Sequence, residues 1–155
     1  MNGKKLRELL ALLTYYHGAP KTKRQLAFEL WPDSSAERAR DCLYKVLRDL
    51  RRLGQRAPLP VRETREGIYL ELTNRQSDLS LFQRWSHSGD PAEWKRAFEL
   101  YRGGFLDKEG YEWAAVAHSY YEVCYFDLLR ALAGHCLSAG REPEANYFQK
   151  LADQL

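Results

Sequence analysis

Apolar residues recur at every third or fourth position near the start of the chain, at Leu6, Leu9, Leu10, Leu13 and Tyr16. This spacing predicts an amphipathic helix, which Gly18 and Pro20 are expected to end. The segment Thr22–Gln25 then has the form of a capping box, in which a threonine hydroxyl and a glutamine side chain each bind an unpaired backbone N–H group. A second helix is therefore predicted to begin at Thr22 and to end before Pro32.

The third predicted helix has the clearest pattern. Ser34–Glu37 is a second capping-box sequence, and Gly54 is expected to end the helix after Leu53. One face is apolar and carries Ala39, Leu43, Val46, Leu47, Leu50 and Leu53. The opposite face carries Glu37, Asp41, Tyr44, Lys45, Arg48 and Arg52, with Arg38, Arg40 and Arg51 on its flanks. The short link between the second and third helices is typical of a helix-turn-helix.

Two short segments after this helix alternate between apolar and polar residues. Val61–Thr64 and Ile68–Leu72 show the period of two that is typical of half-buried strands, and Arg65-Glu66-Gly67 separates them. A hairpin with a basic tip is therefore predicted. Three helices followed by such a hairpin predict a winged helix over residues 1–74.

Residues 75–155 show only helical patterns. Helices are predicted from Asp78 to about Ser88, from Pro91 with Asp90 as its N-cap, over Glu112–Ser138, and from Pro143. Small residues at Ala133, Gly140, Ala145 and Ala152, together with Leu132, have the offsets of a tetratricopeptide repeat. The fold class is therefore predicted to be mainly α, with a winged helix followed by an all-α, tetratricopeptide-like domain over residues 75–155. Its aromatic residues are expected to form the core, among them Trp85, Trp94, Trp113, Tyr120, Tyr121, Tyr125 and Phe126.

The charge of the chain differs between these two halves. Residues 1–74 hold 15 Lys and Arg against nine Asp and Glu, a balance of +6. Residues 75–155 hold nine against 12, a balance of −3. A basic half joined to a mildly acidic half favours a nucleic-acid reader coupled to a second domain. A basic helix face can also be no more than a solvated surface, so the charge and the order of the elements must be read together.

Other classes of protein find little support in the residues. No segment reaches the roughly 20 apolar residues that span a bilayer, and the first segment is amphipathic with charges inside it, unlike the hydrophobic region of a signal peptide. A cytoplasmic protein without membrane contact is therefore expected. The cysteines, Cys42, Cys124 and Cys136, are expected to be free thiols. The four histidines are scattered, and no nucleophile–base, phosphate-loop or Cys-x-x-Cys pattern occurs. An enzyme is therefore not expected, and neither a metal nor a cofactor is required.

Several segments resemble one family. Four segments of the first half are similar to the winged helix of the Streptomyces antibiotic regulatory protein (SARP) family: residues 8–13, Leu26–Asp33, Leu43–Gly54 and Gly67–Leu70. Three segments of the second half resemble the bacterial transcriptional activator domain (BTAD), which follows the winged helix in that family: Asp78–Phe82, Tyr101–Leu106 and Glu112-Trp113. The resemblance implies an activator that reads direct repeats in double-stranded promoter DNA, with RNA polymerase as a partner. A homodimer is left open.

Two departures from the family carry expectations of their own. Relatives have a small β-sheet before the first helix, and this chain begins almost at that helix. We therefore expect a truncated domain in which Leu6, Leu9 or Leu13 is partly uncovered or covered by a neighbouring chain. Tyr44 is also bulkier than the residue usual in the family, which bears on the DNA site that is preferred.

The predicted interface follows from the faces of the third helix. Asp41, Tyr44, Lys45 and Arg48 are expected to meet base edges and nearby phosphates in the major groove. Phosphate contacts are expected from Arg38, Arg40, Arg51 and Arg52, and minor-groove or phosphate contacts from Arg62 and Arg65 in the hairpin. The alternative is a protein–protein interaction module of a larger signalling protein, whose winged helix does not bind DNA.

Overall fold

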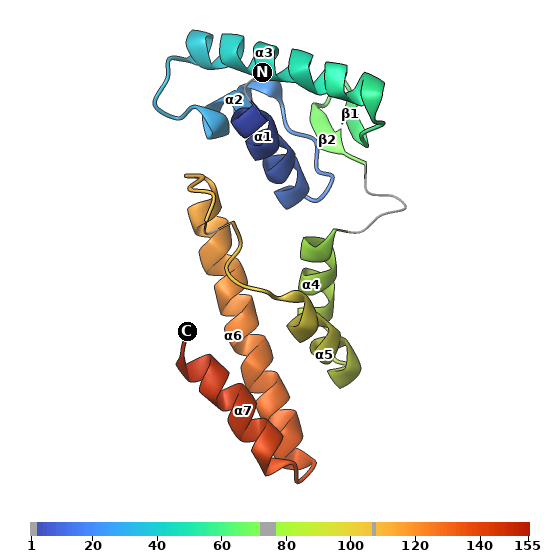
Figure 1. Cartoon of the computed structure of the whole chain (residues 1–155), viewed down its shortest axis with the longest axis vertical. Helices are drawn as coiled ribbons and strands as arrows, with labels where there is room; N and C mark the ends of the chain where they lie inside the picture. Colours follow the sequence, from blue (N-terminus) through green and yellow to red (C-terminus); the bar gives the residue numbers. More distant parts are fainter. Residues whose placement is uncertain (1–2, 72–76, 107) are drawn as a thin grey trace. The chain divides into compact units, whose positions relative to one another are not determined.

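The computed structural model describes residues 3–71, 77–106 and 108–155, and it is mainly α-helical (Figure 1). Over these residues it has seven helices and one two-stranded antiparallel hairpin, which follows the third helix. The mainly α prediction is confirmed. The chain divides into two compact units, Met1–Ser77 and Asp78–Leu155. The boundary predicted between residues 74 and 75 lies outside the described residues.

The first unit begins with α1 (Gly3–Tyr15) and α2 (Lys23–Leu30). The predicted capping box at the start of α2 is confirmed: Thr22 Oγ1 accepts from the Gln25 N–H at 3.1 Å, and Gln25 Oε1 accepts from the Thr22 N–H at 2.9 Å. These two bonds satisfy two of the N–H groups that the first turn of a helix leaves unpaired, which sets the start of α2.

The third helix, α3, spans Ala36–Arg56 and corrects two predictions. Its N-cap is Ser35 and not Ser34, since Ser35 Oγ accepts from the Arg38 N–H at 3.3 Å. Gly54 does not end the helix but lies within it. The helix ends where Ala57 becomes extended, because the residue before a proline is disfavoured in the helical conformation.

The leucines of α1 that were expected to be uncovered are buried within the first unit. Leu6, Leu9 and Leu13 are 5%, 0% and 1% exposed, so the expectation that one of them is partly uncovered is wrong. The reason is that α1 contacts α2, α3 and β2, which close over its leucines without an additional sheet. Lys5 also links α1 to α2, because its ammonium donates to the carbonyl of Leu30 at 2.7 Å. The same ammonium forms an ion pair with the buried Glu8 at 2.8 Å.

The hairpin consists of β1 (Val61–Glu63) and β2 (Ile68–Leu70), with Arg62 opposite Tyr69. Both strands are shorter than predicted, and Leu72 lies outside the described residues. A contact that the sequence did not predict extends the hairpin: Lys21 forms an antiparallel bridge with Ile68, with N–O distances of 3.0 and 2.8 Å. Gly67 makes this approach possible, because a Cβ there would lie 2.4 Å from the Lys21 carbonyl oxygen.

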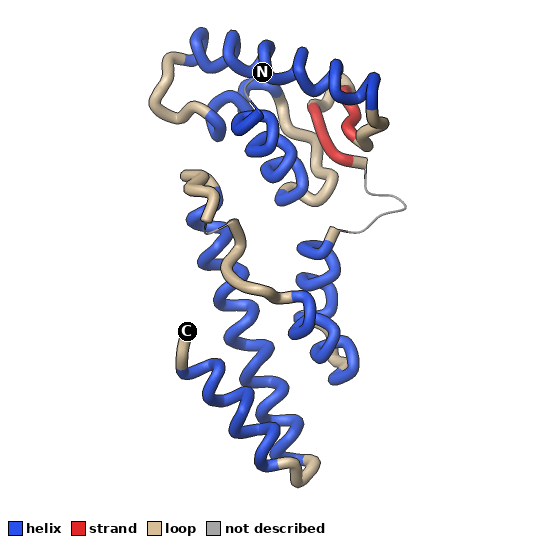
Figure 2. The backbone as a smooth tube through the Cα atoms, viewed as in Figure 1, coloured by secondary structure: helices blue, strands red, loops and turns tan. Residues whose placement is uncertain are grey.

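The second unit contains α4 (Asp78–Ser86), α5 (Pro91–Leu100), α6 (Ala114–Ser138) and α7 (Glu142–Asp153) (Figure 2). The predicted N-cap of α5 is confirmed, since Asp90 accepts from the Ala92 N–H at 2.9 Å. Gly140, with φ +72°, ends α6 as predicted, and the Arg141 N–H returns to the Cys136 carbonyl at 2.8 Å. The helices pack mainly as the pairs α4–α5 and α6–α7.

The aromatic core of the second unit differs in part from the prediction. Tyr121 is 2% exposed, and the ring of Tyr101 stacks on Tyr125 at a centroid distance of 3.8 Å. Tyr120 and Phe126, however, are 42% and 36% exposed. Tyr120 lies at the edge of the core, where its hydroxyl accepts a hydrogen bond from Gln83 of α4 at 3.4 Å. The three cysteines are free, as predicted. None of the helices in the described part of the chain combines the length and the apolar composition that a membrane span requires.

Candidate nucleic-acid interface

The burial of α3 fixes the direction in which its polar residues point. Leu43 and Leu47 are each 1% exposed and Leu50 is 6% exposed, and they pack inward against the rest of the first unit. The opposite side of the helix is in solvent. All eight predicted site residues of α3 are exposed there, and we call this set the basic face of α3: Arg38, Arg40, Asp41, Tyr44, Lys45, Arg48, Arg51 and Arg52.

The middle of the basic face has cations without an acidic partner. Among the residues that the structure describes, no carboxylate lies within 4.0 Å of the side-chain nitrogens of Lys45, Arg48 or Arg52. These three residues are separated by three and four positions, so they are neighbours along one side of the helix. Their charge is therefore available to an anionic partner.

Other cations of the predicted site are already paired. Arg51 donates to both carboxylate oxygens of Glu63 in β1, at 3.0–3.1 Å. Arg40 lies 3.8 Å from its neighbour Asp41. A phosphate contact by Arg51 would have to compete with a bidentate ion pair, which is the stronger kind of charged hydrogen bond. The eight residues that the sequence placed in one interface therefore divide into cations with a carboxylate partner, such as Arg51, and cations without one, such as Arg48.

The hairpin contributes one paired and one unpaired arginine. Arg62 forms an ion pair with Glu71 at 2.8 Å. Arg65 is exposed in the turn, and the described residues place no carboxylate within 4.0 Å of it. The turn is closed by hydrogen bonds between the backbones of Thr64 and Gly67, so Arg65 is held at the tip of the hairpin.

A groove of about 700 Å³ lies between α2 and α3 and contains residues that sequence reasoning missed. Lys23 lies over the ring of Tyr44 at 5.2 Å, and Arg24 lines the same groove. Phe28 is 68% exposed there. The sequence could have identified Lys23 and Arg24 as candidates, because they directly follow the capping threonine and so belong to the first turn of α2. Only the packing of α2 against α3 shows that these two cations border the basic face.

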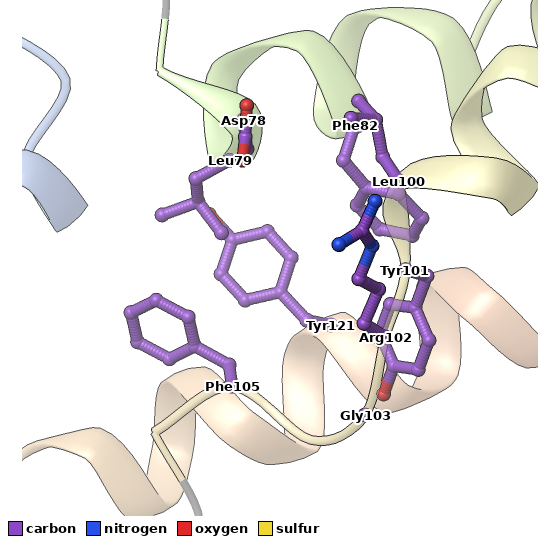
Figure 3. A pocket seen from close by; sticks show the side chains of 9 residues that line it. All are labelled: Asp78, Leu79, Phe82, Leu100, Tyr101, Arg102, Gly103, Phe105 and Tyr121. Carbon is purple, nitrogen blue, oxygen red and sulfur yellow. The ribbon is translucent and has the colours of Figure 1, made fainter.

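The second unit has a smaller hollow of about 120 Å³, lined by parts of α4, α6 and the segment after α5 (Figure 3). Aromatic rings of Phe82, Phe105 and Tyr121 form much of its wall, and Asp78 and Arg102 are its charged residues. It holds no histidine or cysteine that could act as a base or a nucleophile. Among the described residues, no group of three or more His, Cys, Asp or Glu side chains could hold a metal ion.

The basic face of α3, the tip of the hairpin and the groove beside α2 all belong to the first unit. Comparison of the chain with models of protein families, with curated proteins and with solved structures finds no match. Its function is therefore inferred from its own residues and their geometry.

Proposed function

We propose that this chain is a sequence-specific DNA-binding regulator of transcription whose first unit is a winged helix. In this proposal α3 is the recognition helix and the hairpin is the wing. One observation carries it: the buried leucines of α3 aim Lys45, Arg48 and Arg52 outward from one continuous helix, and no carboxylate of the described residues lies within 4.0 Å of their side-chain nitrogens. Such a surface is the electrostatic footprint of a protein that binds nucleic acid.

The dimensions of α3 suit the major groove. A helix of 21 residues is about 31 Å long, and the major groove of B-DNA is about 12 Å wide, which admits one α-helix. Lys45 and Arg48 lie near the middle of the helix, where contact with base edges is expected. Asp41 lies one turn before Lys45, and Tyr44 lies one turn before Arg48. They would complete the set that reads bases.

Phosphate contacts would come from residues around this centre. Arg52 and Arg38 lie toward the two ends of the helix face, and Arg65 lies at the tip of the proposed wing. Lys23 and Arg24 at the start of α2 add two cations that border the same surface. Contacts of this kind fix the position of the protein on DNA and make its affinity depend on salt.

The second unit is proposed to be a tetratricopeptide-like regulatory domain. Support comes from the close packing of α6 and α7, which bury the small residues Ala133, Ala145 and Ala152 to 2–5% exposure. By the resemblance to SARP regulators, the chain would act as an activator at direct repeats and would contact RNA polymerase.

A second candidate function is protein–protein interaction through the first unit. It is favoured by Phe28, which is 68% exposed in the groove between α2 and α3. Ala27, Trp31 and Pro32 line the same groove, and contiguous apolar surface of this kind marks interaction sites. In that case Phe28→Ala would abolish partner binding, and the cations of α3 would be solvated charges only.

The two functions are separated by selecting duplexes from a random DNA library and measuring their affinity by fluorescence anisotropy at several salt concentrations. The double variant Lys45→Ala with Arg48→Ala is compared with Lys95→Ala combined with Lys150→Ala, which removes the same charge from exposed positions of the second unit. We expect the first variant to lose selected-site binding and the second to keep it. If no duplex is enriched, or if both variants bind as the unchanged protein does, the proposal is wrong.

A further inference from the structure

The side of α6 that faces solvent has a regular pattern. Seven positions alternate in steps of four and three, and all of them are exposed: Val116, Tyr120, Val123, Asp127, Arg130, Gly134 and Leu137. We call this set the α6 seam. Alternating steps of four and three are the spacing of the a and d positions in a helix that pairs with another helix.

Most of the seam does not contribute to the core of its own unit; the exception is Tyr120, whose hydroxyl accepts a hydrogen bond from Gln83 of α4 at 3.4 Å. The core of the second unit is on the other side of α6, where Leu128, Leu132 and Cys136 are at most 1% exposed. On the seam, by contrast, Val116 is 77% exposed, and Val123 and Leu137 are each 58% exposed. β-branched and leucine side chains at this spacing gain free energy when a second surface covers them.

Two opposite charges lie at the middle of the seam. Asp127 and Arg130 are three positions apart, and neither makes an ion pair with another described residue. Arg130 lies over the ring of Phe126 at 5.9 Å, which keeps its guanidinium on this side of the helix. A charged pair at the centre of an otherwise apolar seam sets the register and orientation of the helix that binds it.

A second copy of α6 fits this pattern when it runs antiparallel. A two-fold axis between residues 127 and 130 places each Asp127 against the Arg130 of the other copy. The same register places Val123 against Gly134 and Tyr120 against Leu137. Val123 and Tyr120 then each face a smaller side chain, while Val116 falls opposite Arg141, beyond the end of the seam. The space beside Gly134 is open, because a Cβ there would meet nothing within 4 Å. A parallel pair would instead place like charges against each other.

From this complementarity we propose that the chain forms a two-fold symmetric homodimer through antiparallel pairing of its α6 seams. Each copy offers the same surface, as a two-fold interface requires. Asp127 and Arg130 determine the orientation, and the apolar positions on either side supply the buried area. The proposal is independent of DNA binding, since α6 belongs to the unit that lacks the basic face.

The first test is the mass of the full chain in solution, measured by light scattering across a dilution series. The unchanged protein is expected to reach the mass of two chains. Asp127→Arg alone, or Arg130→Asp alone, places like charges together and should give the mass of one chain. The double variant Asp127→Arg with Arg130→Asp restores the opposite pairs and should restore the dimer, while Lys95→Asp serves as a charge-reversal control outside the seam. Circular dichroism of each variant establishes that it is folded.

Cross-linking then tests the orientation. In the antiparallel register, a mixture of Val123→Cys chains and Gly134→Cys chains should form a disulfide-linked pair under mild oxidation. Val123→Cys chains alone should not, because their two cysteines would be about 16 Å apart along the helices. A monomer at every concentration, a double variant that stays monomeric, or efficient linking of Val123→Cys chains to each other would each overturn the proposal.

Discussion

The guanidinium of Arg51 holds the carboxylate of Glu63 in a bidentate ion pair, with N–O distances of 3.0–3.1 Å. The pair joins the last third of α3 to the first strand of the hairpin. Lys23, at the start of α2, lies 4.0 Å from the same carboxylate. An acidic group therefore lies among the cations proposed to bind DNA, and it occupies one of them.

Replacing Glu63 by Gln should strengthen DNA binding. The change removes a negative charge that a phosphate backbone repels, and it releases Arg51 to contact a phosphate. One added phosphate contact should make the slope of log K against log salt steeper by about 0.9. The pair is exposed to solvent, so the unfolding free energy should fall by no more than about 1 kcal/mol. Fluorescence anisotropy at several salt concentrations and urea unfolding measure the two effects.

Glu66→Gln is the matched control for that change. Glu66 is exposed in the turn of the same hairpin, and its substitution removes the same charge without releasing an arginine. It should raise the affinity less and leave the salt slope unchanged. Equal effects of the two substitutions would mean that Arg51 does not gain a phosphate contact.

Arg48 and Arg52 should differ in what they lose when replaced by Ala. Arg48→Ala, at the centre of α3, is expected to cost about 1–3 kcal/mol of binding to the selected duplex and to reduce discrimination at one base pair. Arg52→Ala should weaken binding to specific and scrambled duplexes alike and make the salt slope shallower by about one unit. Titrations of both variants with both duplexes measure these losses of affinity. Identical losses for Arg48→Ala and Arg52→Ala would contradict the separate roles proposed for the two arginines.

Gly67→Ala should destabilise the first unit. Gly67 has φ +143°, and an added Cβ would lie 2.4 Å from the Lys21 carbonyl oxygen, so the bridge between Lys21 and Ile68 must open. The backbone strain by itself is worth roughly 1–3 kcal/mol. Gly54→Ala is the control, since Gly54 is inside α3 with nothing within 4 Å, and it should stabilise the protein by roughly 0.5–1 kcal/mol. Thermal unfolding of both variants tests this difference. A similar shift of the melting temperature in Gly67→Ala and Gly54→Ala would contradict the prediction.

Tyr16→Phe should change the pH dependence of stability at alkaline pH. Burial, together with the Glu29 carboxylate that accepts its hydrogen bond at 3.2 Å, raises the pKa of Tyr16 from 10.0 to about 12. The neutral phenol is thus favoured in the folded protein, so its stabilising contribution is complete below pH 10 and is lost between pH 10 and about 12. Urea unfolding should show the protein more stable than the variant at pH 8, with the difference shrinking over that range. A difference that stays constant would contradict the raised pKa.

Local chemistry made much of the fold predictable. The starts of α2 and α5 follow from Thr22 and Asp90, because a capping side chain binds N–H groups only a few residues away. The buried side of α3 follows from the helical spacing of its leucines. Because burial fixes which side remains in solvent, the exposure of Lys45, Arg48 and Arg52 was predictable as well.

Contacts between distant segments decided the rest. The sequence does not say that Glu63 will hold Arg51 and leave Arg48 unpaired, since both arginines are exposed on the same helix. It also offers two serines as caps for α3. In the structure the Ser34 N–H binds the Trp31 carbonyl at 3.2 Å in the preceding turn, and Ser35 is the cap.

By itself, the sequence of this protein determined the order of its helices, the apolar side of α3 and which of its halves is basic, because these properties depend on spacing and composition along the chain. Only the tertiary structure decided that the leucines of α1 are covered by α2, α3 and β2, that Lys21 pairs with Ile68, and that the α6 seam stays in solvent. The physical reason is that burial and pairing depend on which segments meet in space, and several partners of similar chemistry compete for each position.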